Sequence, residues 1–164
     1  MNVKCSVAAA TALVLLLCSP AIADAINGTN SNDLLRGTEG PDRIRGLAGH
    51  DEMRSRGGND RLAGGKGHDY LLDGRGNDVS RGGPKFDDFW VGRGRDRVIG
   101  GAGSDHLFVR RDGSRDILNC GPGRADNVSP QGGGRLERQD RLRGCEDIVR
   151  VGLVPARISG YPAT

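Results

Sequence analysis

An aspartate returns at every ninth position between residues 33 and 105, and no other residue type in the chain repeats so regularly. The series is Asp33, Asp42, Asp51, Asp60, Asp69, Asp78, Asp87, Asp96 and Asp105. Carboxylates act as general acids and bases, and they also ligate hard metal cations. Self-similarity at a fixed period indicates a stack of identical structural units. Whether these carboxylates act in acid–base catalysis or as metal ligands therefore depends on how the units are stacked.

Each repeat combines a glycine-rich turn with a short strand. Glycines are frequent in the five positions before the aspartate, most completely in residues 64–69 and 100–105. The residue two positions after the aspartate is apolar in eight of the nine repeats, with Ser80 as the exception. These positions are Leu35, Ile44, Met53, Leu62, Leu71, Ser80, Phe89, Val98 and Leu107. We expect this side chain to face inward.

Two nonapeptides of this kind make one turn of a flattened right-handed coil that advances by about 4.8 Å, the spacing of neighbouring strands. Residues eighteen positions apart should then stack. One edge of the coil would carry Asp33, Asp51, Asp69, Asp87 and Asp105, and the other Asp42, Asp60, Asp78 and Asp96. The pattern thus predicts an all-β chain, folded as a right-handed parallel β-roll.

Columns of carboxylates at this spacing repel one another unless a divalent cation lies between them. Calcium accepts six to eight oxygen ligands in flexible geometry, and glycine turns can direct carbonyl oxygens inward because glycine tolerates positive φ. Magnesium demands stricter octahedral geometry, and zinc favours histidine and cysteine. We predict Ca²⁺ in the roughly seven gaps between successive turns. A metal-free solenoid is the alternative.

The array resembles the hemolysin-type calcium-binding (RTX) nonapeptide repeat, G-G-x-G-x-D-x-U-x, with Gly64-Gly65-Lys66-Gly67-His68-Asp69 as a full match. The resemblance covers about half of the chain and implies a parallel β-roll with calcium in its turns and the nine aspartates as metal ligands. The first repeat, residues 28–33, has lost glycines, and Pro84-Lys85 replaces a glycine before Asp87. A disordered glycine-rich linker is the alternative, but disorder gives no reason to keep the aspartates in register.

The N-terminus is typical of a secretory signal. Lys4 precedes an apolar run from Val7 to Leu17, and Ala21-Ile22-Ala23 fits a small-x-small cleavage site. The run is shorter than the roughly 20 residues of a membrane-spanning helix, so we predict no transmembrane span. We predict a signal peptide over residues 1–23, secretion to the extracellular space, and a repeat array over residues 24–108.

The spacing of the aspartates breaks after Asp105, to eleven residues at Asp116 and ten at Asp126. We predict that the array ends there and that residues 109–164 form a small C-terminal cap and tail over the open end of the stack, whose unpaired edge would otherwise invite aggregation. Cys120 and Cys145 are the cysteines left after signal cleavage. In an oxidising compartment they are expected to form a disulfide that pins the cap; two free thiols are the alternative.

The sequence contains no constellation typical of an enzyme. Its three histidines belong to no H-E-x-x-H motif, and neither G-x-S-x-G nor a P-loop occurs. We therefore predict a secreted calcium-binding module that folds on binding calcium and has a structural or binding role, with a hydrolase as a remote alternative. The net charge of +3 indicates no particular partner, and the oligomeric state stays open.

A second function is compatible with the outward positions of the strands. One predicted face collects Arg43, Arg45, Arg61, Arg81 and Arg97. Such a face could bind an anionic polymer, a cell-wall polysaccharide or a nucleic acid, in an adhesion or cell-surface protein. The simpler interpretation is a solvated charged face that keeps the sheet from aggregating.

Overall fold

The computed structural model describes residues 24–123, 125–132 and 135–148, and within these ranges every regular element is a strand. The strands are β1 (Asp24–Asn27), β2 (Leu34–Arg36), β3 (Asp42–Ala48), β4 (Glu52–Arg54), β5 (Arg61–Lys66), β6 (Tyr70–Leu72), β7 (Val79–Pro84), β8 (Asp88–Val91), β9 (Arg97–Ala102), β10 (His106–Val109), β11 (Ile117–Asn119), β12 (Asn127–Pro130), β13 (Arg141–Arg143) and β14 (Asp147–Ile148). The predicted signal peptide and the end of the tail lie outside the described residues.

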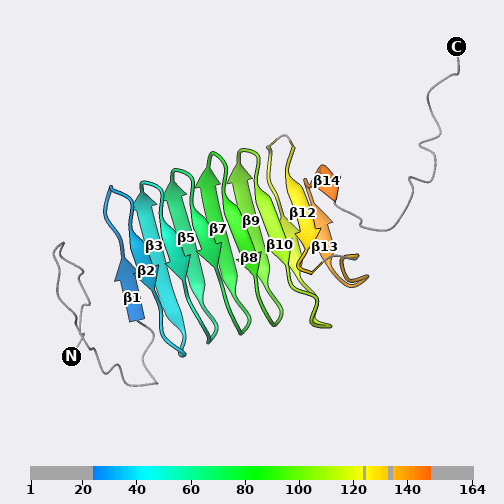
Figure 1. Cartoon of the computed structure of the whole chain (residues 1–164), viewed down its shortest axis with the longest axis horizontal. Helices are drawn as coiled ribbons and strands as arrows, with labels where there is room; N and C mark the ends of the chain where they lie inside the picture. Colours follow the sequence, from blue (N-terminus) through cyan, green and yellow to red (C-terminus); the bar gives the residue numbers. More distant parts are fainter. Residues whose placement is uncertain (1–23, 124, 133–134, 149–164) are drawn as a thin grey trace, which may run out of the picture.

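Consecutive strands alternate between two parallel sheets, as Figure 1 shows. One seven-stranded sheet has the order β1-β3-β5-β7-β9-β11-β13, and the other has the order β14-β12-β10-β8-β6-β4-β2. Within the repeats, paired residues are eighteen positions apart, as in Ile44 with Leu62 and Leu71 with Phe89. The predicted parallel β-roll and its stacking register are confirmed.

The core is a narrow double row of side chains between the two sheets. All nine positions two residues after an aspartate are buried, with at most 3% of each residue exposed. Strand residues on either side of them face outward, which gives β3 its alternation of buried and exposed residues. Val91 and Val109 add to the core from the ends of β8 and β10. One or two inward residues per strand are enough because neighbouring turns stack directly on each other.

The stack continues beyond Phe108, where the break in spacing predicted that the array would end. Leu118 pairs with Val98, Val128 with Leu107, and Leu142 with Leu118, so β11 to β13 extend the same two sheets. The extra residues lengthen the turns and leave the pairing of strands intact. A cap in this region therefore consists of further turns. The division of the chain at residue 108 stays a prediction.

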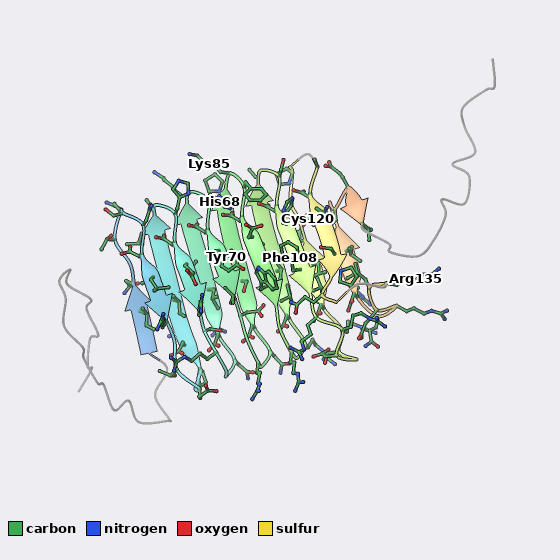
Figure 2. All side chains as sticks on the ribbon, viewed as in Figure 1. His68, Tyr70, Lys85, Phe108, Cys120 and Arg135 are labelled. Atoms are coloured by element: carbon green, nitrogen blue, oxygen red, sulfur yellow. A yellow bond between two sulfur atoms is a disulfide. The ribbon has the colours of Figure 1, made fainter. Side chains whose placement is uncertain are left out.

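The predicted disulfide is present in this C-terminal part. Cys120 and Cys145 form the bond, with their Cα atoms 5.2 Å apart. Cys120 is fully buried next to the core, where Figure 2 labels it. The bond ties the end of β11 to the loop between β13 and β14 and so holds the last turns together.

Replacing Ser80 with valine should stabilise the roll. Its hydroxyl is buried without a hydrogen-bond partner in the described structure, and it lies in register with Leu62 and Val98. An unsatisfied buried hydroxyl costs about 1 to 3 kcal/mol, so Ser80→Val should raise the free energy of unfolding in excess calcium by about 1 kcal/mol. Ser80→Ala, which removes the hydroxyl without adding volume, is the control. Destabilisation by both variants in denaturant titrations would contradict this account.

Candidate metal sites in the turns

The predicted aspartates lie at the junctions where turns lead into strands. Eight of the nine are buried, each at most 2% exposed, while Asp33 in the first turn is partly exposed. They form the two columns expected from the register, one at each edge of the roll. No lysine, arginine or histidine forms an ion pair with them in the described part of the chain. The columns are therefore rows of buried acids without protein counter-charges.

One oxygen of each carboxylate is used by the backbone. The Oδ1 atom accepts a hydrogen bond from the backbone N–H of the aspartate one turn earlier, as Asp69 does from Asp51 at 3.0 Å and Asp87 from Asp69 at 2.8 Å. The same bond joins every consecutive pair in both columns. This ladder fixes the carboxylates in place and holds successive turns in register.

The second oxygen has no such partner. The Oδ2 atom is buried and lacks a hydrogen bond in seven of the nine predicted residues. These seven are Asp51, Asp60, Asp69, Asp78, Asp87, Asp96 and Asp105. Burying an ionised oxygen without a partner is costly, so a protein that does it repeatedly needs protons or cations at these points.

The exceptions are the first aspartate of each column. Oδ2 of Asp33 accepts hydrogen bonds from the backbone N–H and the hydroxyl of Thr29, at 2.6 and 2.9 Å. Oδ2 of Asp42 is bound in the same way by Thr38, at 2.7 and 3.1 Å. A threonine thus satisfies the carboxylate in each of the two turns at the beginning of the stack.

Backbone carbonyl oxygens approach the unpartnered carboxylate oxygens in the first column. A Cβ atom placed on Gly46 would lie 2.6 Å from the carbonyl oxygen of Gly64, and closer still to Oδ2 of Asp51. A Cβ on Gly82 would likewise lie 2.7 Å from the carbonyl oxygen of Gly100. Any side chain here would fill the space in which the two oxygens converge, which explains the glycine. A carboxylate and a carbonyl oxygen are the donors that calcium prefers, so the residues present fit this ion.

Burial raises the pKa of the stacked carboxyls. Removal from water raises the pKa of Asp60 to about 6, that of Asp78 to about 7 and that of Asp87 to about 8, and the neighbouring aspartates of the same column contribute to each rise. The backbone hydrogen bond acts in the opposite direction, because it favours the charged form. Without a metal ion, these columns thus tend to hold protons near neutral pH.

Four further aspartates belong to these edges, three of them buried and Asp140 half-buried, and the nonapeptide pattern does not single them out. Asp116, Asp126 and Asp140 continue the two ladders by accepting from the N–H groups of Asp96, Asp105 and Asp116, at 2.7 to 3.0 Å. All three have an apolar residue two positions later, as the repeats do, but they lie outside the strict nine-residue period and so fall outside the predicted array. The fourth, Asp73, occupies a position where the other edge has glycine.

Comparison with known families agrees with this geometry. The model of the RTX calcium-binding nonapeptide repeat (4 copies) matches residues 27–62, 54–84 and 81–112, which together cover more than half of the chain. The chain belongs to this RTX repeat family. Comparison with curated proteins and with solved structures gave no match.

Membership fixes the general properties of the repeat region. RTX repeats bind calcium in a β-roll, they are structural or binding modules that are not generally enzymatic, and proteins that contain them are typically extracellular. In the described residues, no helix is long and apolar enough to cross a membrane.

Acidification should stabilise the calcium-free roll. The raised pKa values mean that the folded state takes up protons more readily than the unfolded chain. Their contribution to stability is therefore complete below about pH 4 and is lost as pH rises through about 6 to 8. In excess chelator, the strand signal in circular dichroism should grow when pH falls from about 8 to about 5. A strand signal that stays constant or weakens as the pH is lowered would contradict the raised pKa values of these aspartates.

Proposed function

We propose that this protein is a secreted calcium-binding β-roll whose repeat region folds when calcium enters its turns, and that it is a structural or binding module and not an enzyme. The observation that carries the proposal is that, among the repeat aspartates, seven buried Oδ2 atoms have no hydrogen bond. They belong to seven of the nine aspartates that the repeat pattern singled out. A chain of roughly seven Ca²⁺ ions would satisfy them all.

Each ion would link two turns. In the first column, the donors beside one another are the aspartate of one turn and the first-glycine carbonyl of the next turn, as in Asp51 with Gly64. In the second column, the corresponding donors include Asp60, Asp78 and Asp96. The bound ion supplies positive charge to buried carboxylates that have none from the protein. Calcium would therefore bind the stacked form of the chain and not the unfolded form.

The free energy of calcium binding is large enough to decide whether the repeats fold. If extracellular calcium stands about tenfold above each dissociation constant, every site stabilises the fold by about 1.4 kcal/mol, and roughly seven sites contribute about 10 kcal/mol. That is the size of the total stability of an ordinary domain. Where calcium is scarce, as we expect inside the cell, the fold would lack this contribution and the chain would stay unfolded for export. The signal-like segment 1–23 and the Cys120–Cys145 disulfide support this route.

Calcium removal is the direct test. Thorough chelation at about pH 8 should abolish the strand signal and protease resistance of the disulfide-intact mature chain, and added calcium should restore both cooperatively. Isothermal titration would count the ions. A repeat region that keeps its strand spectrum after chelation would overturn the proposal.

A matched pair of variants tests the role of the unpartnered oxygen. Asp69→Asn removes a charge whose Oδ2 has no protein partner, whereas Asp33→Asn removes one that Thr29 already satisfies. Asparagine can still accept the backbone hydrogen bond in the ladder. We expect Asp69→Asn to raise the calcium concentration for half-folding several-fold and to lose about one ion per chain, with a smaller effect for Asp33→Asn. Equal effects would contradict the assignment.

The exposed arginines favour a second candidate function. Arg43 pairs in register with Arg61 and Arg45 lies two positions further along β3, so these side chains share one outer face with Arg81 and Arg97. Within the described residues, none of the five forms an ion pair. Four of them line a shallow groove of about 280 Å³. We propose as the alternative an adhesion or cell-surface role, with this face bound to an anionic polymer.

Binding to an acidic polysaccharide separates this alternative from a purely structural role. Calcium-loaded protein should bind a polyuronate probe with an affinity that falls steeply with salt, and Arg43→Ala with Arg61→Ala should weaken binding several-fold. Arg54→Ala is the control, because Arg54 is exposed on the other sheet and paired with Glu52. Absent binding at low salt, or equal loss in the control, would exclude the arginine face.

A further inference from the structure

Asp73 departs from the repeat pattern at a position that matters for ion binding. It lies five residues before Asp78, where every repeat of the first column has a glycine and the preceding turn of the second column has Ser55. Asp73 directly follows β6 and is only 2% exposed. A third acidic side chain is therefore buried at a position where the repeats of the first column have no side chain.

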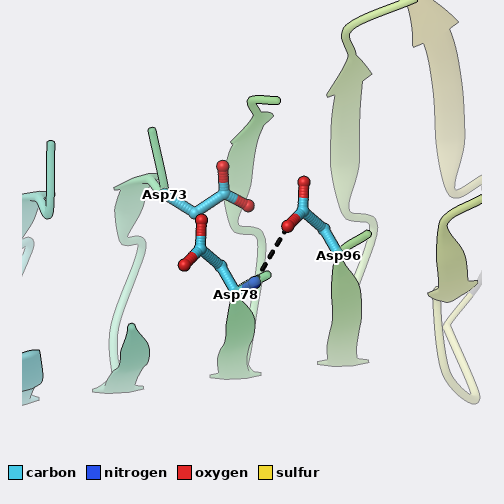
Figure 3. A group of neighbouring side chains, drawn as sticks. All are labelled: Asp73, Asp78 and Asp96. Carbon is cyan, nitrogen blue, oxygen red and sulfur yellow. Dashed lines mark hydrogen bonds between the residues drawn. The ribbon is translucent and has the colours of Figure 1, made fainter. Parts of the chain in front are cut away.

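Asp73 faces two aspartates of the second column. Carboxylate oxygens of Asp73, Asp78 and Asp96 all lie within 4.8 Å of one another, and Figure 3 shows the three carboxylates grouped together between neighbouring turns. One oxygen of each is held by the backbone. Asp73 Oδ1 accepts from Gly92 N–H at 2.7 Å, and Asp96 Oδ1 accepts from Asp78 N–H at 2.9 Å.

Two oxygens of this group lack partners. Oδ2 of Asp78 and Oδ2 of Asp96 are buried without a hydrogen bond, and both residues are only 1% exposed. Within the described residues, no basic side chain forms an ion pair with any of the three aspartates. Burial, followed by the charges of Asp96 and Asp78, raises the pKa of Asp73 well above its usual value. The group requires positive charge that the protein does not supply.

We propose that Asp73, Asp78 and Asp96 form a three-carboxylate cation site, which binds Ca²⁺ more tightly than the other turns and also accepts a trivalent lanthanide ion. The inference rests on the proposed function and concerns one gap of the stack. Ligand charge and rigidity set the affinity of a calcium site. This gap offers three carboxylates, each with an oxygen fixed by the backbone or the ladder. It lies between the turns of β7 and β9, near the middle of the stack, so the first ion would bind there and join turns on both sides.

The competing occupant is a proton shared within the group. A protonated Asp73 could donate to a neighbouring carboxylate and would leave this gap without a metal ion. The two cases differ in what Asp73 contributes to metal binding. A cation site loses affinity when Asp73 is replaced, whereas a proton site does not.

Terbium(III) and calcium titrations of the mature, disulfide-intact chain test the proposal. We expect wild-type protein to bind one ion per chain in a first step about tenfold tighter than the later steps, seen by terbium luminescence and by calorimetry. Asp73→Ser installs the residue that the chain itself has one turn earlier, and Asp73→Asn keeps the shape of the side chain. Both should weaken the first step about tenfold and leave the later steps unchanged.

The control is Asp88→Asn, which removes the same charge from the outer side of β8, where Asp88 contacts His68 and His106. It should leave the first step intact. An unchanged first step in Asp73→Ser would overturn the proposal in favour of a shared proton. Equal affinities for all ions in the wild-type protein would overturn it as well, even if the variants failed to fold. Absence of any calcium binding would instead refute the proposed function as a whole.

Discussion

The hydrogen bond between an aspartate carboxylate and the backbone N–H one turn earlier is the interaction on which the rest of the roll depends. It repeats along both edges and holds each carboxylate in a buried position. Because it uses only one of the two oxygens, it leaves the other facing the gap between turns. The hydrogen bond that sets the register of the stack thus also leaves a buried carboxylate oxygen that requires positive charge.

The rest of the architecture follows from the small spacing between turns. Neighbouring turns are so close that a side chain on Gly46 or Gly82 would collide with the oxygens of the site. The core has equally little room and accepts one or two side chains per strand. Hydrophobic burial is correspondingly thin, because aromatic residues make up only 4% of the chain. A fold with so little core is one in which bound cations can contribute much of the stability.

The C-terminal part shows which features of the repeat are essential for stacking. Asp116, Asp126 and Asp140 keep the ladder although the turns before them are longer. Strand pairing tolerates this because extra residues can loop outward at the edge without shifting the inward side chain. The disulfide then ties the end of β11 to the loop between β13 and β14. Regular spacing is therefore not required for stacking, while the pair of an aspartate and an inward apolar residue two positions later persists.

The sequence by itself determined the period, the inward residues and the two columns of aspartates, because a parallel coil with a fixed repeat admits only one stacking register. It also pointed to the pairing of Cys120 with Cys145. Only the tertiary structure decided which carboxylate oxygens are satisfied. Thr29 and Thr38 donate to Oδ2 in the first two turns, whereas Oδ2 of the other seven repeat aspartates has no hydrogen-bond partner among the described residues. The tertiary structure also showed that strand pairing continues after Phe108 and that Asp73 lies beside Asp78 and Asp96. Distances between atoms in adjacent turns depend on how tightly the turns pack, and a linear pattern of residue types does not contain that information.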